Sequence, residues 1–263
     1  MNIGCIVGRG ADRVREQADK IYDDEFLASL YDCLNPWSRS EDFYFGMATE
    51  IGGRVLDLGC GTGMLACGIA VQGLNVTGVD SAEGMLRVAR SRREAELVAW
   101  IKADARTLHL NQRFDFIYMT GHAFQAMRSD DDALALLRTA SEHLTSGGCF
   151  VFESRNPAQR AWLDWNREKS QIVETAEHGR IEASYEAALI PDTDVVELTH
   201  GFRLLDKGTT IVAQTQLRFI DQDHLEQLIS AANLSIMAWY GDWNRTPLRA
   251  DSREFVVVTR RSG

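Results

Sequence analysis

A glycine-rich turn after a short apolar strand constrains the fold of this chain more than any other feature. Residues 55–63 read VLDLGCGTG, and a helical run from Met64 to Val71 follows. A strand, a glycine turn and a helix in this order form the nucleotide-binding corner of a doubly wound α/β fold. The glycines stand at positions 59, 61 and 63, and Met64 occupies the place where a dinucleotide fingerprint GxGxxG needs its third glycine. The turn therefore indicates a nucleoside-containing cofactor other than a dinucleotide.

Strands and helices alternate through the chain after this turn. We expect strands over residues 54–58, 75–79, 98–102, 114–119 and 149–153. Helices are expected over residues 62–72, 82–95 and 130–144. A repeated strand–helix order predicts a parallel sheet with right-handed crossovers. The expected core ends with a helix over 222–232 and strands over 234–240 and 254–259.

Two further segments have other patterns. Residues 11–34 and 41–51 carry apolar residues at helical spacing, and Asn35-Pro36 breaks the pattern between them. The region 171–219 contains several β-rich runs that no long helix separates, which predicts an antiparallel meander. These runs cover residues 181–189, 195–205 and 209–219.

The patterns divide the chain into three parts. We expect an N-terminal helical lead-in or lid over residues 1–50. The core takes residues 51–160 and 220–263, and the antiparallel insertion takes residues 161–219. The insertion is expected to cover a substrate or to make an oligomer contact. The predicted fold class is thus α/β and doubly wound, with a β insertion and N-terminal helices.

The charge and the cysteine content argue against several classes of protein. The 263 residues carry a formal net charge of −10, which disfavours binding to nucleic acid because phosphate contacts need clustered Lys and Arg. The five cysteines form no CxxC pair and indicate reduced thiols. No apolar run approaches a membrane span, no secretory signal is recognisable, and no metal-ligand spacing occurs. We therefore expect a cytoplasmic monomer or homodimer with no metal, membrane or nucleic-acid partner.

Acidic residues follow two of the expected strands. Asp80 ends the second strand, and Asp104 lies just after the third. Ligands of a doubly wound sheet bind at this end of the strands, where the Asp80 carboxylate can accept hydrogen bonds from both ribose hydroxyls. The alternative for Asp80 is a cap on the following helix, and the alternative for Asp104 is a cap on a turn.

Five segments occur in the order and spacing of a known family. They are VLDLGCGTG at 55–63, VTGVDSAEGML at 76–86, ADA at 103–105, FDFIYM at 114–119 and LTSGGCFVF at 144–152. Together they resemble the successive motifs of class I S-adenosylmethionine-dependent methyltransferases. The lead-in around 31–44 and the meander resemble those of bacterial small-molecule methyltransferases. The resemblance implies a Rossmann-like sheet of seven mostly parallel strands with a reversed last strand, and S-adenosyl-L-methionine as the cofactor.

The resemblance also implies cofactor-binding roles. Asp57 and Gly59 are expected to hold the methionine portion, with Gly61 letting the backbone approach. Asp80 is expected at the ribose. Residues expected around the adenine are Ser81, Met85, Asp104 and Ala105. Residues expected near the sulfonium or over the methionine end are Met119, Thr120, Tyr31 and Trp37, and the alternative for the two aromatic residues is simple packing.

Two residues are candidates on the acceptor side. His122 follows the fourth strand and is the candidate to orient or deprotonate an acceptor, with a structural histidine as the alternative. Arg155 follows the fifth strand and can pair with a carboxylate or phosphate of the acceptor, or make an ordinary salt bridge.

The function that these patterns predict is methyl transfer to an oxygen or nitrogen of a small metabolite by in-line displacement. A non-catalytic cofactor-binding regulator or partner protein stays open as an alternative. A nicotinamide-dependent oxidoreductase is disfavoured, because Met64 breaks the fingerprint and the chain contains no Tyr-x-x-x-Lys. The identity of the acceptor has no comparable sequence code.

Overall fold

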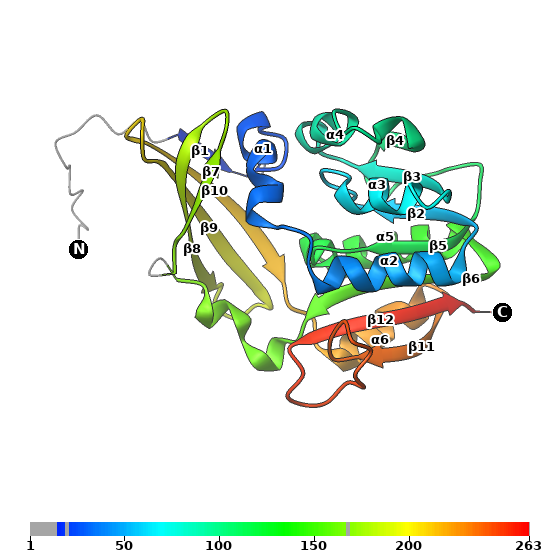
Figure 1. Cartoon of the computed structure of the whole chain (residues 1–263). Coiled ribbons are helices and arrows are strands. Elements are labelled where there is room, and N and C mark those ends of the chain that lie inside the picture. The colour runs from blue at the N-terminus through cyan, green and yellow to red at the C-terminus, as the bar shows by residue number, and fades with distance from the viewer. Residues whose placement is uncertain (1–14, 19–20, 167–168, 263) are drawn as a thin grey trace.

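A seven-stranded sheet forms the core of the computed structural model, which describes residues 15–18, 21–166 and 169–262 (Figure 1). The strand order is β11-β12-β6-β5-β2-β3-β4. The strands are β2 (Arg54–Leu58), β3 (Asn75–Asp80), β4 (Val98–Lys102), β5 (Phe114–Met119), β6 (Leu144–Arg155), β11 (Leu234–Tyr240) and β12 (Glu254–Arg261). The strands from β6 to β4 are parallel, whereas β12 is antiparallel to both of its neighbours. The predicted doubly wound sheet with a reversed last strand is confirmed.

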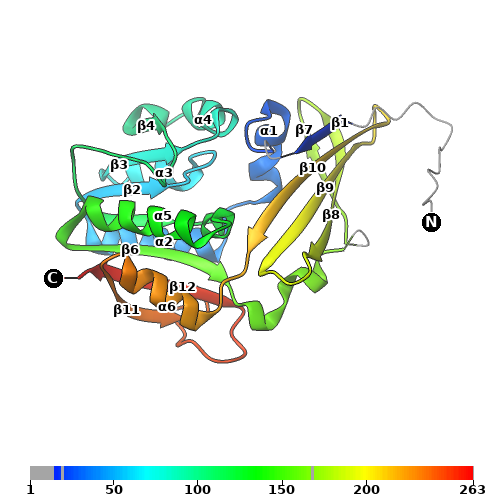
Figure 2. The same cartoon turned by 180° about the vertical axis from the view of Figure 1, so that it is seen from behind.

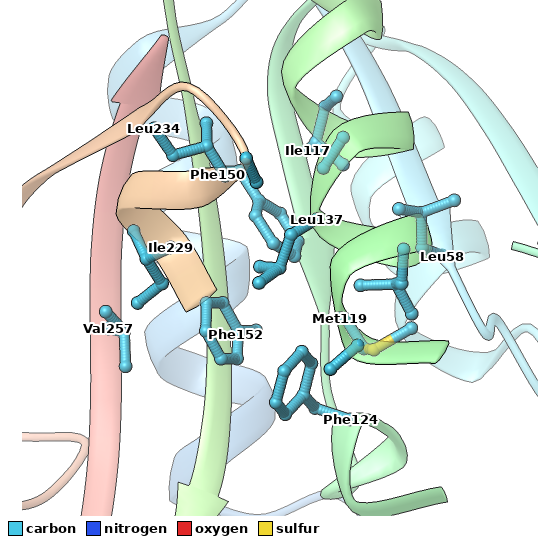
Figure 3. Close-up of a cluster of buried hydrophobic side chains, with 14 of the residues drawn as sticks. Leu58, Ile117, Met119, Phe124, Leu137, Phe150, Phe152, Ile229, Leu234 and Val257 are labelled. Atoms are coloured by element: carbon cyan, nitrogen blue, oxygen red, sulfur yellow. The ribbon is translucent and has the colours of Figure 1, made fainter. Parts of the chain in front are cut away.

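Helices cover both faces of this sheet. The helices α2 (Arg39–Ile51) and α3 (Met64–Ala70) pack on one face, where Tyr44 and Ile69 are buried against Tyr118. The helices α5 (Asp130–His143) and α6 (Gln222–Ala231) cover the opposite face (Figure 2). Their side chains enclose Phe150 and Phe152 of β6 in the larger hydrophobic core (Figure 3). In the described part of the chain, no helix has the length and apolar character needed to cross a membrane.

A second sheet stands beside the core and contains the predicted meander. Its order is β1-β10-β9-β8-β7, with β7 (Gln171–Thr175), β8 (Gly179–Leu189), β9 (Val195–Leu204) and β10 (Thr209–Arg218) antiparallel to one another. The face of this sheet that looks toward the core packs on α1 (Glu25–Leu34) through Leu27 and Leu30. Figure 1 shows α1 between the second sheet and the core.

The predicted helix over residues 11–34 is wrong for its described first half. Residues Arg15–Ala18 form β1, which pairs in parallel with β10, and α1 begins only at Glu25. Asp24 caps that helix, because its side chain accepts a hydrogen bond from the backbone N–H of Leu27 at 3.1 Å. The unpaired edge of β10 draws residues 15–18 into an extended strand, which the helical spacing of these residues does not predict. The remaining residues of the predicted segment, 11–14 and 19–20, lie outside the described part.

The predicted helix over residues 82–95 is also too long. The helix α4 (Glu83–Arg90) stops early, and a turn leads into the single-turn helix Ala95–Leu97. At the other predicted elements of the core, the strands and helices form with ends that differ by a few residues, most at β6, which begins at Leu144. Helix and strand ends are the least reliable part of a sequence-based assignment.

The glycine turn after β2 adopts a backbone that glycine favours. The φ angles of Gly59, Gly61 and Gly63 are +77°, +54° and +73°, all in the left-handed region. A Cβ on Gly63 would lie 2.4 Å from the ring of Trp100, whereas a Cβ on Gly61 would meet nothing within 4 Å. The turn is therefore packed against β4 at Gly63 and open at Gly61.

The contrast between these two glycines gives a stability test. Gly61→Ala adds only the strain of a left-handed alanine, about 1–2 kcal/mol. We expect Gly63→Ala to cost about 1–3 kcal/mol more, because the new methyl group overlaps Trp100. Urea unfolding of both variants measures the difference. Equal losses would show that the turn shifts away from Trp100 without cost.

Candidate active site

Polar side chains gather at one edge of the seven-stranded sheet. The parallel strands β2, β3, β5 and β6 end there, at Leu58, Asp80, Met119 and Arg155. Because β12 is antiparallel to β6, its first residue Glu254 lies at the same edge and pairs with Arg155 in register. The carboxyl ends of parallel strands are where ligands of this architecture bind.

Asp80 is fixed against the glycine turn. Its Oδ2 accepts a hydrogen bond from the N–H of Gly61 and its Oδ1 accepts one from the N–H of Ala82, each at 2.8 Å. Burial raises the pKa of this carboxyl, and the backbone hydrogen bonds act against that rise. A Cβ on Gly61 would meet nothing within 4 Å, so the space beside this carboxylate is open. Asp80 does not cap α4, whose N-cap is Ala82, but its carboxylate remains an acceptor that fits a ribose hydroxyl.

Asp57 is a buried carboxyl with one unused oxygen. Tyr118 donates a hydrogen bond to its Oδ2 at 2.8 Å, but within the described residues its Oδ1 has no hydrogen-bond partner. Burial raises the pKa of Asp57 to about 8, the Tyr118 hydrogen bond lowers it, and the charge of Asp80 adds to the rise. A buried acceptor of this kind fits a cationic donor, such as the ammonium group of the methionine portion of the cofactor.

The residues just before α1, and those within it, are tied to the sheet edge where these polar side chains lie. The side chain of Asp23 accepts a hydrogen bond from the N–H of Glu83 at 2.8 Å. Asp32 binds both Thr62, at 2.5 Å, and Arg92, which ties α1 to the glycine turn. Arg92 also donates to the backbone carbonyl of Thr62 at 2.6 Å, which strengthens this connection.

Two tyrosines of this segment face the site. The rings of Tyr22 and Tyr31 meet edge to face with centroids 6.2 Å apart. The Tyr31 hydroxyl lies 3.3 Å from the position of a Cβ on Gly121, just after β5. Tyr22 is within electrostatic range of both Asp80 and Arg155. Burial raises the pKa of both tyrosines, so both hydroxyls stay protonated at neutral pH.

Glu153 is the centre of a buried hydrogen-bond network. It accepts hydrogen bonds from the Tyr44 hydroxyl, from Thr120 Oγ1 at 3.3 Å and from the N–H of His122 at 3.1 Å. Burial raises its pKa, while His122 and the Tyr44 hydrogen bond lower it. These contacts fix the loop after β5 in position, including the left-handed backbone of His122 with its φ of +56°.

His122 is held by a carboxylate. Its Nε2 and Oε2 of Glu254 lie 2.8 Å apart, and both side chains are 14% exposed. Trp243 meets the imidazole edge to face with ring centroids 6.1 Å apart. An ionised Glu254 places the proton on Nε2, which leaves Nδ1 as the basic nitrogen. This is the arrangement of a histidine base with an orienting partner.

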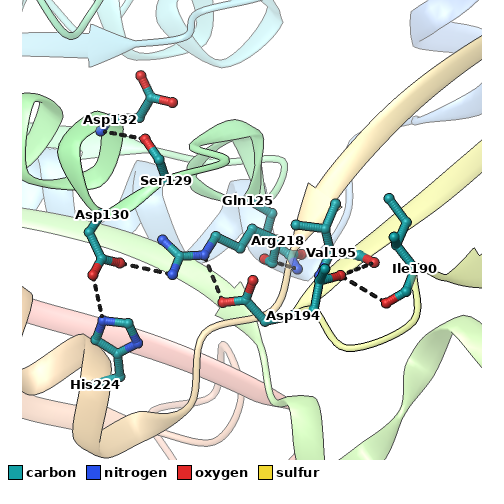
Figure 4. Close-up of polar contacts among 10 residues, drawn as sticks. Gln125, Ser129, Asp130, Asp132, Ile190, Asp194, Val195, Arg218 and His224 are labelled. Carbon is teal, nitrogen blue, oxygen red and sulfur yellow. Dashed lines mark hydrogen bonds and ion pairs between the residues drawn. The ribbon is translucent and has the colours of Figure 1, made fainter.

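The direct contacts of Arg155 among the described residues are with neutral side chains. Its guanidinium lies 4.9 Å from the ring centroid of Trp165, and Nη1 donates to Oε1 of Gln125 at 2.8 Å. Gln125 in turn donates to the backbone carbonyl of Arg218 at 3.0 Å (Figure 4). Arg218 also pairs with Asp130 and Asp194 and so joins the second sheet to the core.

A polar row crosses the inner face of the second sheet. Tyr185 and His200 are register partners with rings 5.3 Å apart, and His200 Nε2 lies 3.2 Å from Thr215 Oγ1. Burial lowers the pKa of His200 to about 4, so this imidazole is neutral at pH 7. The neighbouring positions Ala183 and Leu198 are buried, whereas the three polar side chains are only partly buried.

Most predicted site residues meet at this edge, and some do not. Trp37 packs on α2 and α3 near Phe45 and Gly68, which is the simple packing left open for it. The carboxylate of Asp104 is bound by Arg106, which lowers its pKa. The remaining cofactor candidates occur as follows: Ser81 is exposed, Ala105 is partly buried, and Met85 and Met119 are buried.

Several residues of the site are not predicted by the sequence patterns. Tyr44, Tyr118, Tyr22 and Gln125 carry no sequence signal beyond their place in amphipathic or apolar segments. Glu254 could have been found, because the first residue of a reversed last strand must lie where the parallel strands end.

Comparison with known proteins agrees with this architecture. Residues 55–148 match a family described as methyltransferase domain. The chain is 27% identical over 213 residues to the cypemycin N-terminal methyltransferase of Streptomyces sp., covering 80% of this chain and 84% of that protein. Among solved structures, the CcbJ methyltransferase from Streptomyces caelestis is 25% identical with a TM-score of 0.76, covering 93% and 99% of the two chains. An S-adenosylmethionine-dependent methyltransferase from Clostridium acetobutylicum has a TM-score of 0.75 at 19% identity, covering 90% and 98%.

The chain is therefore an enzyme of the methyltransferase class, with a Rossmann-like core. More particularly, it is similar to bacterial S-adenosylmethionine-dependent methyltransferases, and S-adenosyl-L-methionine is its cofactor. The unpartnered oxygen of Asp57, the carboxylate of Asp80 and the open turn at Gly61 fit that cofactor.

The raised pKa of Asp57 predicts a pH dependence of stability. An unfolded carboxyl ionises near pH 4, so between about pH 4 and pH 8 the folded protein binds more protons than the unfolded chain. Its free energy of unfolding therefore falls as the pH rises through this window. In Asp57→Asn we expect this decline to be absent, which raises its stability relative to the unmodified protein by up to about 1.4 kcal/mol per pH unit. Urea unfolding at about pH 5 and about pH 8 measures the change, and parallel curves would contradict it.

The contrast between Asp80 and Asp104 gives a binding test. We expect Asp80→Asn to weaken S-adenosylhomocysteine binding by roughly tenfold or more, on the order of 1.4 kcal/mol, because one ribose acceptor is lost. Asp104→Asn should have little effect, since Arg106 already binds that carboxylate. Isothermal titration calorimetry measures both affinities. A larger loss at Asp104 than at Asp80 would reverse the assignment.

Proposed function

We propose that this enzyme methylates the nitrogen of an amine acceptor, and that His122 removes the proton which the nitrogen must release. The observation that carries the proposal is the His122–Glu254 pair at 2.8 Å, at the sheet edge between the cofactor turn and the second sheet. The cofactor supplies an electrophilic methyl group on a sulfonium, and the acceptor lone pair displaces the thioether in line. The protein binds and orients the acceptor and accepts its proton.

The chemistry of this pair favours nitrogen over oxygen. An α-ammonium group has a pKa of about 8, close enough to an imidazole for efficient proton transfer. An aliphatic hydroxyl, like water with its pKa of about 15.7, needs a stronger base or a metal ion. Glu254 keeps the imidazole in one orientation and stabilises it once it is protonated. The relative named an N-terminal methyltransferase supports an amine acceptor as well.

Further features support a small molecule or a peptide end as the acceptor. The net charge of −10 disfavours nucleic acid. The free thiols Cys33, Cys60, Cys67 and Cys149 support a reducing, cytoplasmic location. The N-terminal segment and the second sheet flank the cofactor edge and are proposed to enclose the acceptor, whether the enzyme acts as a monomer or as a homodimer.

The proposed function is tested with methyl-deuterated cofactor and matched acceptors. The probes are glucosamine 6-phosphate with glucose 6-phosphate, and alanyl-alanine with its N-acetylated form. We expect labelled product, read by mass spectrometry, only from compounds with a free amine. Methylation confined to hydroxyl groups would contradict the proposal. Binding of S-adenosylhomocysteine without any transfer would favour the non-catalytic alternative.

His122→Asn tests the proposed base, since asparagine tolerates the left-handed backbone at this position. We expect kcat to fall about 10²- to 10⁴-fold while S-adenosylhomocysteine affinity stays unchanged. Glu254→Gln should also lower kcat, because its amide no longer selects the required tautomer. The control is His224→Asn, which breaks a histidine–carboxylate pair with Asp130 outside the site. An unchanged kcat in His122→Asn would remove His122 from the mechanism.

A further inference from the structure

Arg155 forms no ion pair with a carboxylate among the described residues. Burial lowers the pKa of its guanidinium, and the charges of Glu254 and Glu153 act against that fall. These two acids have closer partners: Glu254 binds His122, and Glu153 binds Tyr44, Thr120 and the backbone of His122. A partly buried cation without an ion pair is costly to a fold, and a ligand that neutralises it is bound strongly.

The groups that hold Arg155 are neutral and rigid. Gln125 is 1% exposed, and its donation to the carbonyl of Arg218 turns its oxygen toward Arg155. The backbone of Trp165 is held by Ala187 of the second sheet at 3.2 Å, which fixes the ring under the guanidinium. One edge of the guanidinium is thus ordered by neutral contacts. Its remaining N–H groups stay available for a planar, two-oxygen acceptor.

The position of Arg155 separates it from the cofactor turn. In the sheet, β6 and β5 lie between β12 and β2, so Arg155 is two strands away from Gly59. Its own register partner is Glu254, which orients the proposed base His122. Tyr22 lies within electrostatic range of both Arg155 and Tyr185, which places one end of the polar row near Arg155.

We infer that Arg155, Gln125 and Trp165 form an anion-binding subsite for the acceptor, and that the acceptor is an amine which also carries a carboxylate or phosphate group. This inference rests on the proposed function and extends it. The subsite binds the anionic end while the amine lies near His122. The neutral row of Tyr185, His200 and Thr215 supplies hydrogen bonds to the uncharged part of the molecule.

The test titrates the S-adenosylhomocysteine-saturated protein with acetate and, separately, with inorganic phosphate at constant ionic strength. The readout is the side-chain Nε–H NMR signal of Arg155, identified as the signal that Arg155→Gln loses. We expect a saturable shift with at least one of the two anions, and the stronger ligand shows which anionic group the subsite prefers. No shift with either anion, or a shift that never saturates, would overturn the subsite.

A second variant keeps the fold and fills the subsite from within. Gln125→Glu is close to isosteric and places a carboxylate against Arg155, so we expect anion affinity to fall at least about tenfold. Arg138→Gln, an exposed arginine on α5, is the control and should leave the titration unchanged. Equal affinity in Gln125→Glu and the unmodified protein would contradict the inference.

The same variants show whether Arg155 binds an anionic group of the acceptor or the carboxylate of the cofactor. We expect Arg155→Gln to bind S-adenosylhomocysteine within about twofold of the unmodified protein in calorimetry. A tenfold loss would show that Arg155 binds the cofactor carboxylate and would overturn the inference. These measurements need no methyl transfer. The subsite can therefore be confirmed even if amine methylation fails, and amine methylation can be confirmed even if the subsite binds no anion.

Discussion

The exclusion of water from charged groups at one sheet edge governs the arrangement of this molecule. Asp57, Glu153 and Arg155 are all removed from solvent to the extent that their pKa values shift against the charged form. Such groups destabilise the fold unless hydrogen bonds or opposite charges compensate. Glu153 obtains its compensation inside the protein, from Tyr44 and the loop after β5. Asp57 and Arg155 do so only in part, and these are the two positions where we propose that ligands bind.

The reversed strand β12 makes the acceptor side of the site. A parallel strand at this position would place its first residue at the opposite edge of the sheet. The antiparallel register instead brings Glu254 opposite Arg155, where it reaches His122. The proposed base His122 is therefore oriented by the last described strand, while the glycine turn follows the first strand of the core. Glu254 and the glycine turn lie far apart in the sequence, and the sheet brings them to the same edge.

The cofactor half of the site was predictable because its determinants are local. Three glycines with left-handed backbone, an acid at the end of the next strand and a strand–helix alternation are all visible within 30 residues of one another. On the acceptor side the sequence offered only His122 and Arg155 as candidates. The contacts around them were not predictable, because they join residues far apart in sequence: Gln125 binds Arg218, and Trp165 binds Ala187. The strand β1 was missed for the same reason, since only the free edge of β10 makes that segment extended. Local residue spacing predicts the conformation that a segment favours by itself. The conformation of these segments depends instead on the residues that they contact.

The apolar inner face of the second sheet is interrupted by polar residues near the proposed acceptor site. Its inner face is buried against α1 through Phe202 and Ala213, and lower down against Trp162 through Val196. Between these two apolar areas stand Tyr185, His200 and Thr215, whose side chains are only partly buried. A sheet selected only for stability would continue its apolar face through this row. The interruption therefore has a cost, and the hydrogen bonds that we propose between this row and an acceptor are the interactions that offset it.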